Sequence, residues 1–201
     1  MASKYMNVGG KPLCRCNTVK YLGIPLISGK HLKIDFDVVK RNFYATCNCI
    51  MSNSYCTNEL IQLQLQESYC LPILMYILPG LCPNVPQVRD LNVCWNSVYR
   101  KIFHYNKWES VKCCIKGLGR LDLVHILAFQ TLKFWRSLRQ SSSSTLKDIF
   151  MCFRMQPYYM SLLKTYSSAT TDSFSALKYK VHEHYSHTCV EREAFSRLIC
   201  V

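Results

Sequence analysis

Apolar residues recur every three or four positions in four consecutive stretches of this chain, between residues 34 and 138. The clearest stretch follows Asn84 and Pro86, where valine, leucine, tryptophan and isoleucine repeat at this spacing through residues 88–103. Such spacing places the apolar side chains on one face of an α-helix, and Asn followed by Pro is typical of a helix start. Helices with one apolar face must bury that face against a partner, so a helical bundle is predicted here.

One of the four stretches, residues 58–78, fits two structures. The string LIQLQLQ alternates as a strand does, whereas Ile61, Leu65, Tyr69 and Tyr76 follow a helical row. We predict a helix that is kinked near Pro72, because proline removes one backbone donor and clashes with the preceding turn.

The segments on either side of the predicted bundle have a different pattern. Before residue 33, β-prone residues are separated by turn signals at Asn17 and at Ser28 with Gly29, which predicts a small β-hairpin. The serine run at residues 141–145 has the composition of a flexible linker, and short helices are expected beyond it. The predicted fold is therefore mainly α, with a β-hairpin over residues 1–32, a helical domain over 33–140, and a linker with C-terminal helices over 141–201.

The charge of the chain is strongly positive. Lys and Arg number 25 against 12 Asp and Glu, and the excess falls mainly in residues 1–50, with +6, and residues 85–140, with +7. Such a field attracts polyanions, which makes nucleic acid the leading class of partner. A high pI is also common among proteins that bind no nucleic acid, so charge alone leaves this open.

Thirteen cysteines raise the question of disulfides or metal. The start MASKYMNVGG has no apolar signal segment, which predicts reduced thiols and an intracellular location, in cytoplasm or nucleus. No CxxC pair is present to hold zinc. His182, Glu183, His184, His187 and Cys189 would point around a helix rather than converge, so we interpret them as a solvated helix end. The longest apolar run, residues 71–82, is shorter than the roughly 20 residues of a membrane span.

Recognisable catalytic motifs are absent from the sequence. It contains no phosphate-binding glycine loop, no hydrolase elbow and no adjacent pair of aspartates such as two-metal nucleotidyl transfer uses. Asp35 and Asp37 come nearest to such a pair. They are predicted to lie in the first turn of a helix, where the helix dipole favours carboxylates, rather than to bind a metal. No cofactor is predicted for this chain.

Four sequence blocks resemble, in order and spacing, the reverse transcriptases of non-LTR (LINE-type) retrotransposons. VKYLGI at residues 19–24 resembles the KYLG signature of that family. SYCLPILMY at 68–76, VCWNSVYRKIFHYNKWESV at 93–111 and KGLGRLDLVHI at 116–126 resemble the blocks that follow it. The resemblance covers roughly residues 4–138.

This resemblance implies an RNA-directed DNA polymerase, of which the chain would carry the end of the palm and the thumb. The hairpin would be a primer grip at Tyr21, Leu22 and Gly23. Trp95 looks like a tryptophan of the family's thumb, and its place in the apolar stripe predicts a core position. The metal-binding aspartates of the family, which hold Mg²⁺ in the full-length enzyme, are expected upstream of residue 4. The chain alone is therefore expected not to polymerise, and the missing palm and fingers of the same polyprotein would be a partner.

The charge and the resemblance together predict binding to an RNA or DNA template-primer duplex through a basic thumb surface. The basic residues assigned to this surface are Lys33, Lys40, Arg41, Arg100, Lys101, Lys107, Lys112 and Lys116. A helical scaffold that binds protein partners through cysteine-rich and aromatic surfaces is the alternative. Uncovered apolar side chains on the hairpin and the first helix would favour that alternative.

Overall fold

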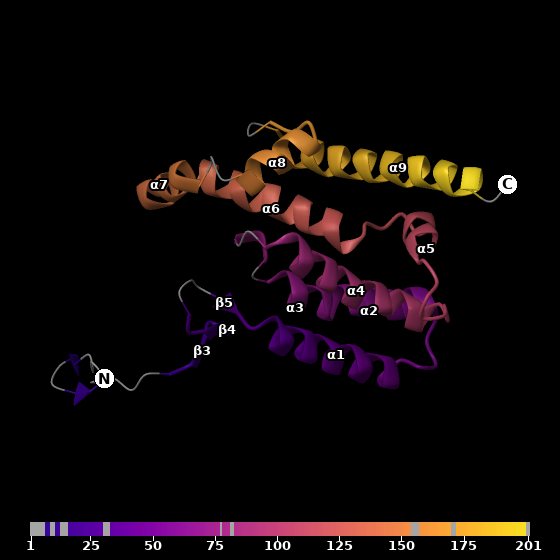
Figure 1. The fold of residues 1–201 in the computed structure, drawn as a ribbon, viewed down its shortest axis with the longest axis horizontal. Helices are drawn as coiled ribbons and strands as arrows, with labels where there is room; N and C mark the ends of the chain where they lie inside the picture. Colours follow the sequence, from indigo (N-terminus) through magenta and orange to yellow (C-terminus); the bar gives the residue numbers. More distant parts are fainter. Residues whose placement is uncertain are drawn as a thin grey trace.

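The computed structural model describes residues 7–8, 11–12, 16–29, 33–76, 78–80, 83–153, 157–169 and 172–199, and over these residues the chain is mainly α, as predicted. The helices are α1 (Phe36–Asn53), α2 (Glu59–Tyr69), α3 (Leu71–Met75), the 3₁₀ turn η1 (Leu78–Gly80), α4 (Val85–Ile102), α5 (Lys112–Gly117), α6 (Leu123–Gln140), α7 (Ser144–Phe153), α8 (Pro157–Thr165) and α9 (Phe174–Ile199). Figure 1 shows them stacked in the order α1, then α2 to α4, then α6, then α9.

The strands all lie before residue 35 in the described part of the chain. Strands β1 (Asn7–Val8) and β2 (Lys11–Pro12) form one antiparallel pair, and β3 (Thr18–Tyr21), β4 (Ile24–Ile27) and β5 (Lys33–Ile34) form a three-stranded antiparallel sheet. A hairpin is present as predicted, but its turn lies at Leu22 and Gly23, between β3 and β4, and not at the predicted turn signals Asn17 and Ser28 with Gly29. The remaining residues before position 33 (1–6, 9–10, 13–15 and 30–32) lie outside the described residues.

Strand β5 was not predicted. The helical spacing placed Ile34 at the start of the first helix, whereas α1 begins at Phe36 and leaves Lys33 and Ile34 to form the strand. The Asp35 carboxylate accepts hydrogen bonds from the backbone N–H groups of Asp37 and Val38, which makes Asp35 the N-cap. Lys33 and Ile34 are therefore free to pair with β4, and the Asp35 N–H donates to the Pro25 carbonyl, 2.9 Å away. The sheet is thus joined directly to the start of α1.

Side-chain caps also fix the starts of the two longest central helices. Asn84 and Gln87 cap α4 reciprocally, each side chain accepting from the other's backbone N–H, with Pro86 in the first turn. Asp122 caps α6 by accepting from the His125 N–H. Helices α2 and α3 meet at Cys70, just before Pro72, where the kink is predicted.

The main core lies between α1, α2, α3, α4, α5 and the start of α6. Phe43 and Trp95 have no exposed surface, and Trp95 packs edge-on against Tyr99 with ring centroids 5.8 Å apart. Gln66 is also fully buried, and its amide donates to the Cys47 carbonyl at 3.1 Å, which links α2 to α1. Each large apolar side chain that is fully buried in this core, such as that of Phe43, stabilises the fold by about 1.5–3 kcal/mol. Trp95 is a core residue, as the sequence predicts.

A second core joins the later helices to the far half of α6. Leu132 and Trp135 of α6 pack with Phe150 of α7, Tyr159 of α8 and Val181 of α9. Helix α6 is therefore shared by both cores, and its predicted apolar face is the element that unites the molecule. Helix α7 begins at Ser144, inside the serine run whose composition predicts a linker, because this packing gives it a partner.

The histidine-rich segment lies in the middle of α9 and not at a solvated helix end. His182 and His184 are partly buried, and the His184 ring lies 4.8 Å from the Tyr166 ring and 5.8 Å from the His125 ring, between centroids. Burial, together with the positive charges of Lys178 and His125, lowers the pKa of His182. The solvated interpretation is wrong for His182 and His184, because α9 runs as one helix along α6, whereas Glu183 and His187 are exposed. The Cys189 side chain lies outside the described residues.

Among the helices of the described residues, none combines the length and the apolar character needed to cross a membrane.

Candidate nucleic-acid interface

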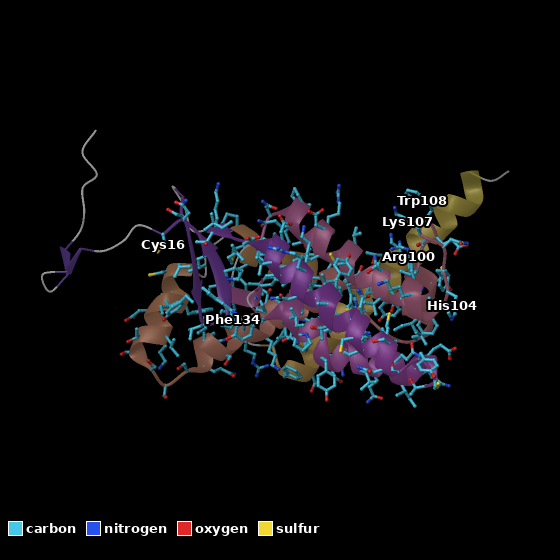
Figure 2. All side chains as sticks on the ribbon, turned by 90° about the horizontal axis from the view of Figure 1, so that it is seen from below. Cys16, Arg100, His104, Lys107, Trp108 and Phe134 are labelled. Atoms are coloured by element: carbon cyan, nitrogen blue, oxygen red, sulfur yellow. The ribbon has the colours of Figure 1, made fainter. Side chains whose placement is uncertain are left out.

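The basic residues predicted to form one surface fall into two groups, one around the start of α1 and one from the end of α4 onward. Lys33, Lys40 and Arg41 belong to the hairpin end, which we define as residues 16–29 and 33–41. The others belong to the α4 exit, defined as residues 100–116. Figure 2 shows Cys16 at one end of the long axis and Arg100, Lys107 and Trp108 at the other. Helix α1, with 18 residues and thus about 27 Å long, runs between the two ends.

The turn of the hairpin has an unusual backbone. Tyr21 pairs with Ile24, and the two residues between them both have positive φ, 47° at Leu22 and 81° at Gly23. This is the conformation of the tightest hairpin turns, which suits glycine and strains leucine. A Cβ at Gly23 would meet no atom within 4 Å, so backbone conformation and not crowding within the chain requires the glycine. Tyr21 and Leu22 are 63% and 69% exposed, which leaves this predicted grip open to a partner.

Leu22 borders an open groove of about 610 Å³ between the hairpin and helix α6. Tyr76 and Phe134 supply aromatic walls, and Lys133 of α6 is the cation in the lining. The ammonium group of Lys133 already lies over the Phe174 ring, 5.0 Å from its centroid. The structure therefore places Leu22, one of the three predicted grip residues, in the lining of the same groove as Lys133.

The two cations at the start of α1 bond to different groups of Asp37, Lys40 to its carboxylate and Arg41 to its backbone carbonyl. Lys40 forms an ion pair with Asp37 at 2.8 Å, and the Arg41 Nε donates to the Asp37 carbonyl at 3.4 Å. The Lys40 hydrogen bond and charge lower the pKa of Asp37, and the same hydrogen bond raises the pKa of Lys40. Asp35 caps the helix and Asp37 pairs with Lys40, as first-turn carboxylates do. Lys33 is exposed on β5.

At the other end, helix α4 stops in a tight hydrogen-bonded motif. The Tyr105 N–H donates to the Arg100 carbonyl at 3.0 Å, and the Phe103 N–H donates to the Tyr99 carbonyl at 2.9 Å. His104 has a φ of 56°, the left-handed conformation that glycine usually supplies just past a helix end. The chain therefore reverses sharply here, while Ile102 is buried and Phe103 packs partly against the core, as predicted.

A closed β-turn follows directly. The Glu109 N–H donates to the Asn106 carbonyl at 3.1 Å, so Lys107 and Trp108 are the two central residues. The Glu109 carboxylate accepts from the Asn106 N–H at 2.6 Å and from the Asn106 side-chain amide at 3.0 Å. These hydrogen bonds lower the pKa of Glu109. The Arg100 Nε donates to the Glu109 carbonyl at 3.1 Å, which ties the turn to the last turn of α4.

The tip of this turn presents an aromatic ring that the sequence analysis did not single out. Trp108 is 87% exposed, the most exposed large hydrophobic residue in the described part of the chain. The Lys107 ammonium lies over its ring, 5.1 Å from the centroid. The sequence holds one signal for this ring. Lys107 and Trp108 are adjacent, they lie outside the apolar faces of the predicted helices, and basic residues precede and follow them.

The remaining cations of the α4 exit surround this turn. Lys101 is exposed and donates to the Asn48 side chain of α1 at 2.9 Å, and Lys112 is exposed on the first turn of α5, with Lys116 one helical turn further on. Residues 100–120 contain six Lys or Arg and one acidic residue, Glu109. Of the six, Arg120 is paired with Glu67 at 3.1 Å. The α4 exit thus keeps several cations available for phosphates.

Within the described residues, no group of three or more His, Cys, Asp or Glu side chains is arranged to hold a metal ion. The thiols of Cys47, Cys70 and Cys94 are buried in the main core, and burial raises the pKa of Cys47 and of Cys70. Such thiols are poor nucleophiles and metal ligands. The arrangement that can bind a ligand is therefore the basic, aromatic turn at the α4 exit and the groove beside the hairpin.

In comparisons with known proteins, no family model, no curated protein and no solved structure matches this chain.

Proposed function

We propose that this chain is the palm-end and thumb portion of a non-LTR retrotransposon reverse transcriptase, and that it binds template-primer duplex through phosphate contacts at the α4 exit. The aspartates that hold Mg²⁺ for polymerisation belong, in this proposal, to the upstream part of the polyprotein. The chain by itself then binds nucleic acid without extending it.

One observation carries the binding function. The α4 exit gathers Lys101, Lys107 and Lys112 from a helix end, a closed turn and a following helix, and the single acidic residue of the segment is engaged by Asn106. Lysines on three short connected elements can reach successive phosphates, whereas an isolated lysine supplies little affinity. The resemblance of VKYLGI and the three later blocks to the family agrees with this assignment.

The test is the salt dependence of affinity for a duplex of mixed sequence. If about four of the cations neutralise phosphates, log affinity should fall with log salt with a slope near −3.6, at about −0.9 per contact. Replacing Lys101, Lys107 and Lys112 together by alanine should flatten that slope by up to about three units and weaken binding equally for different sequences.

A matched control removes the same charge elsewhere. Lys147, Lys164 and Lys178 are exposed on α7, α8 and α9, and their triple alanine variant should keep nearly the parent slope. Affinity that does not depend on salt, or equal losses in both triple variants, would contradict a specific phosphate surface at the α4 exit.

A protein-binding scaffold is the second candidate, and exposed apolar residues favour it. Tyr21 and Leu22 of the hairpin, with Leu60, Ile61 and Tyr69 of α2, are each more than half exposed. The first helix contributes no such residue in the described chain, so the uncovered surface is that of the hairpin and of α2. A palm domain of the same polyprotein would cover the hairpin in the first proposal, whereas a foreign partner would do so in the second.

A further inference from the structure

Trp108 lies at the tip of a turn whose conformation is fixed from both sides. The Glu109 carboxylate closes the turn through Asn106, and Arg100 ties it to α4, so the position of the ring does not depend on packing of the ring itself. A ring that is 87% exposed gains almost none of the free energy that burial would give a tryptophan. The other tryptophans contrast with it, because Trp95 and Trp135 are 0% and 4% exposed.

The surroundings of the ring define what it could bind. Lys107 lies over the ring, and Lys101 and Lys112 precede and follow the turn in sequence, so a flat group stacked on Trp108 would lie beside at least one cation in a basic segment. A nucleotide combines a flat base with a phosphate, and base stacking on an aromatic side chain is tolerant of sequence. The bases inside a duplex are already stacked on one another and are not accessible to such a ring. Only an unpaired base satisfies both features.

We propose that Trp108 is a stacking site for an unpaired nucleotide, such as the single-stranded template beside a duplex, with Lys107 and Lys112 contacting its flanking phosphates. This inference rests on the proposed nucleic-acid function. It adds that an unpaired nucleotide, and not only duplex phosphates, binds at the α4 exit. Duplex phosphates bind the cations, and an unpaired base binds the ring.

The intact chain offers a direct optical test, because Trp108 is the exposed one of its three tryptophans and the other two are buried. The probes are an oligothymidylate of about twelve nucleotides, a blunt duplex of mixed sequence, and the same duplex with a thymidine overhang. The fluorescence of Trp108 is the part of the tryptophan emission that added iodide quenches. Stacking on the oligothymidylate or on the overhang should lower this part of the emission, and the blunt duplex should lower it much less.

Variants at this position separate stacking from charge. Trp108→Ala should weaken oligothymidylate binding by about 5- to 150-fold and leave the salt slope unchanged, since no phosphate contact is lost. Trp108→Phe should restore part of the affinity, and Trp108→Leu, which is apolar without a π-face, should not. The Lys101, Lys107 and Lys112 triple variant should instead change the slope.

The outcomes also distinguish this inference from the proposed function. If Trp108→Ala binds every probe as tightly as the parent while the lysine triple variant loses salt-dependent affinity, the stacking site is wrong and the phosphate surface stands. If neither variant changes binding, both are wrong. If vesicles with anionic lipids shift the Trp108 emission to the blue and the oligothymidylate does not, the ring is a membrane contact and the inference is overturned.

Discussion

The hairpin end and the α4 exit both carry three or more lysine and arginine residues, but they hold these cations in different ways. At the hairpin end, Lys40 is paired with the Asp37 carboxylate, Arg41 donates to the Asp37 backbone carbonyl, and Tyr21 and Leu22 are exposed. At the α4 exit, the one acidic residue is occupied by Asn106, and the exposed ring of Trp108 has a cation above it. Positive charge by itself therefore does not locate a binding site, since pairing within the chain decides which cations remain available.

The two ends also differ in what supports them. The α4 exit rests on the main core through Ile102, Val111 and Ile115, which are all nearly or fully buried. The β3–β4 hairpin has no fully buried residue, and it joins the body mainly through β5 and α1. A site on the α4 exit is held rigidly before a ligand arrives, whereas the hairpin needs a covering partner to be equally fixed.

The largest expected difference between the two ends is in stability. Ile115→Ala removes a side chain with no exposed surface and should lower the free energy of unfolding by about 2–5 kcal/mol. Val19→Ala at the hairpin, where the side chain is 56% exposed, should change it by no more than about 0.5 kcal/mol. Urea denaturation followed by circular dichroism measures both. Equal losses would mean that the hairpin is as firmly anchored as the α4 exit.

Next in size is the effect of the hairpin turn. Gly23→Ala places a Cβ at a φ of 81° and should cost about 1–2 kcal/mol, because L-residues are disfavoured in left-handed conformations. Leu22→Asn is the matched control, since asparagine tolerates positive φ better than leucine does, and it should stabilise the hairpin. Amide hydrogen exchange should show these changes in β3 and β4 and leave α4 unaffected. Faster exchange throughout the chain in Gly23→Ala would contradict a local role.

The third expected difference concerns pH. The pKa of Glu109 is lowered from its ordinary 4.5 by Asn106, so the closed turn is favoured above that value and is lost only as the pH falls through the lowered pKa. Asn106→Ala should return the pKa of Glu109 towards 4.5 and leave that of Asp37, which Lys40 lowers, unchanged. Carboxyl chemical shifts measured by NMR across acid pH report both residues. A pKa of Glu109 that is the same in parent and variant would show that the Asn106 side-chain amide does not hold the Glu109 carboxylate in solution.

The smallest expected effect is that of the hairpin cations on nucleic-acid binding. Replacing Lys33, Lys40 and Arg41 together by alanine should change the salt slope for duplex by less than about one unit, because in our proposal the phosphates bind at the α4 exit and Lys40 is already paired with the Asp37 carboxylate. The comparison with the α4-exit triple variant is direct, since both remove three positive charges. A larger change from the hairpin variant would move the phosphate surface to the other end of the molecule.

Much of the fold was already determined by the sequence alone. The starts of α4 and α6 and the core position of Trp95 followed from Asn84 with Pro86, from Asp122, and from three- and four-residue apolar spacing. These features are local, because a cap contacts residues two or three positions away and a helical face depends only on the period. The β3–β4 pairing is local in the same sense, but the turn signals at Asn17 and Ser28 did not locate its turn at Leu22 and Gly23.

Tertiary structure decided the features that depend on residues distant in sequence. The third strand formed because β4 offered an open edge to Lys33 and Ile34, and α7 formed within a serine run because α6 gave it an apolar partner. His184 became partly buried because α9 lies along α6 next to His125. Likewise, the eight predicted cations could be counted in the sequence, but the exposure of Trp108 beside Lys107 and the hydrogen bond from Lys101 to Asn48 of α1 depend on how the chain packs. The apolar spacing of a helix and its side-chain caps involve residues within one or two helical turns. Burial and charge pairing depend on residues that are distant in sequence and come together only when the chain folds.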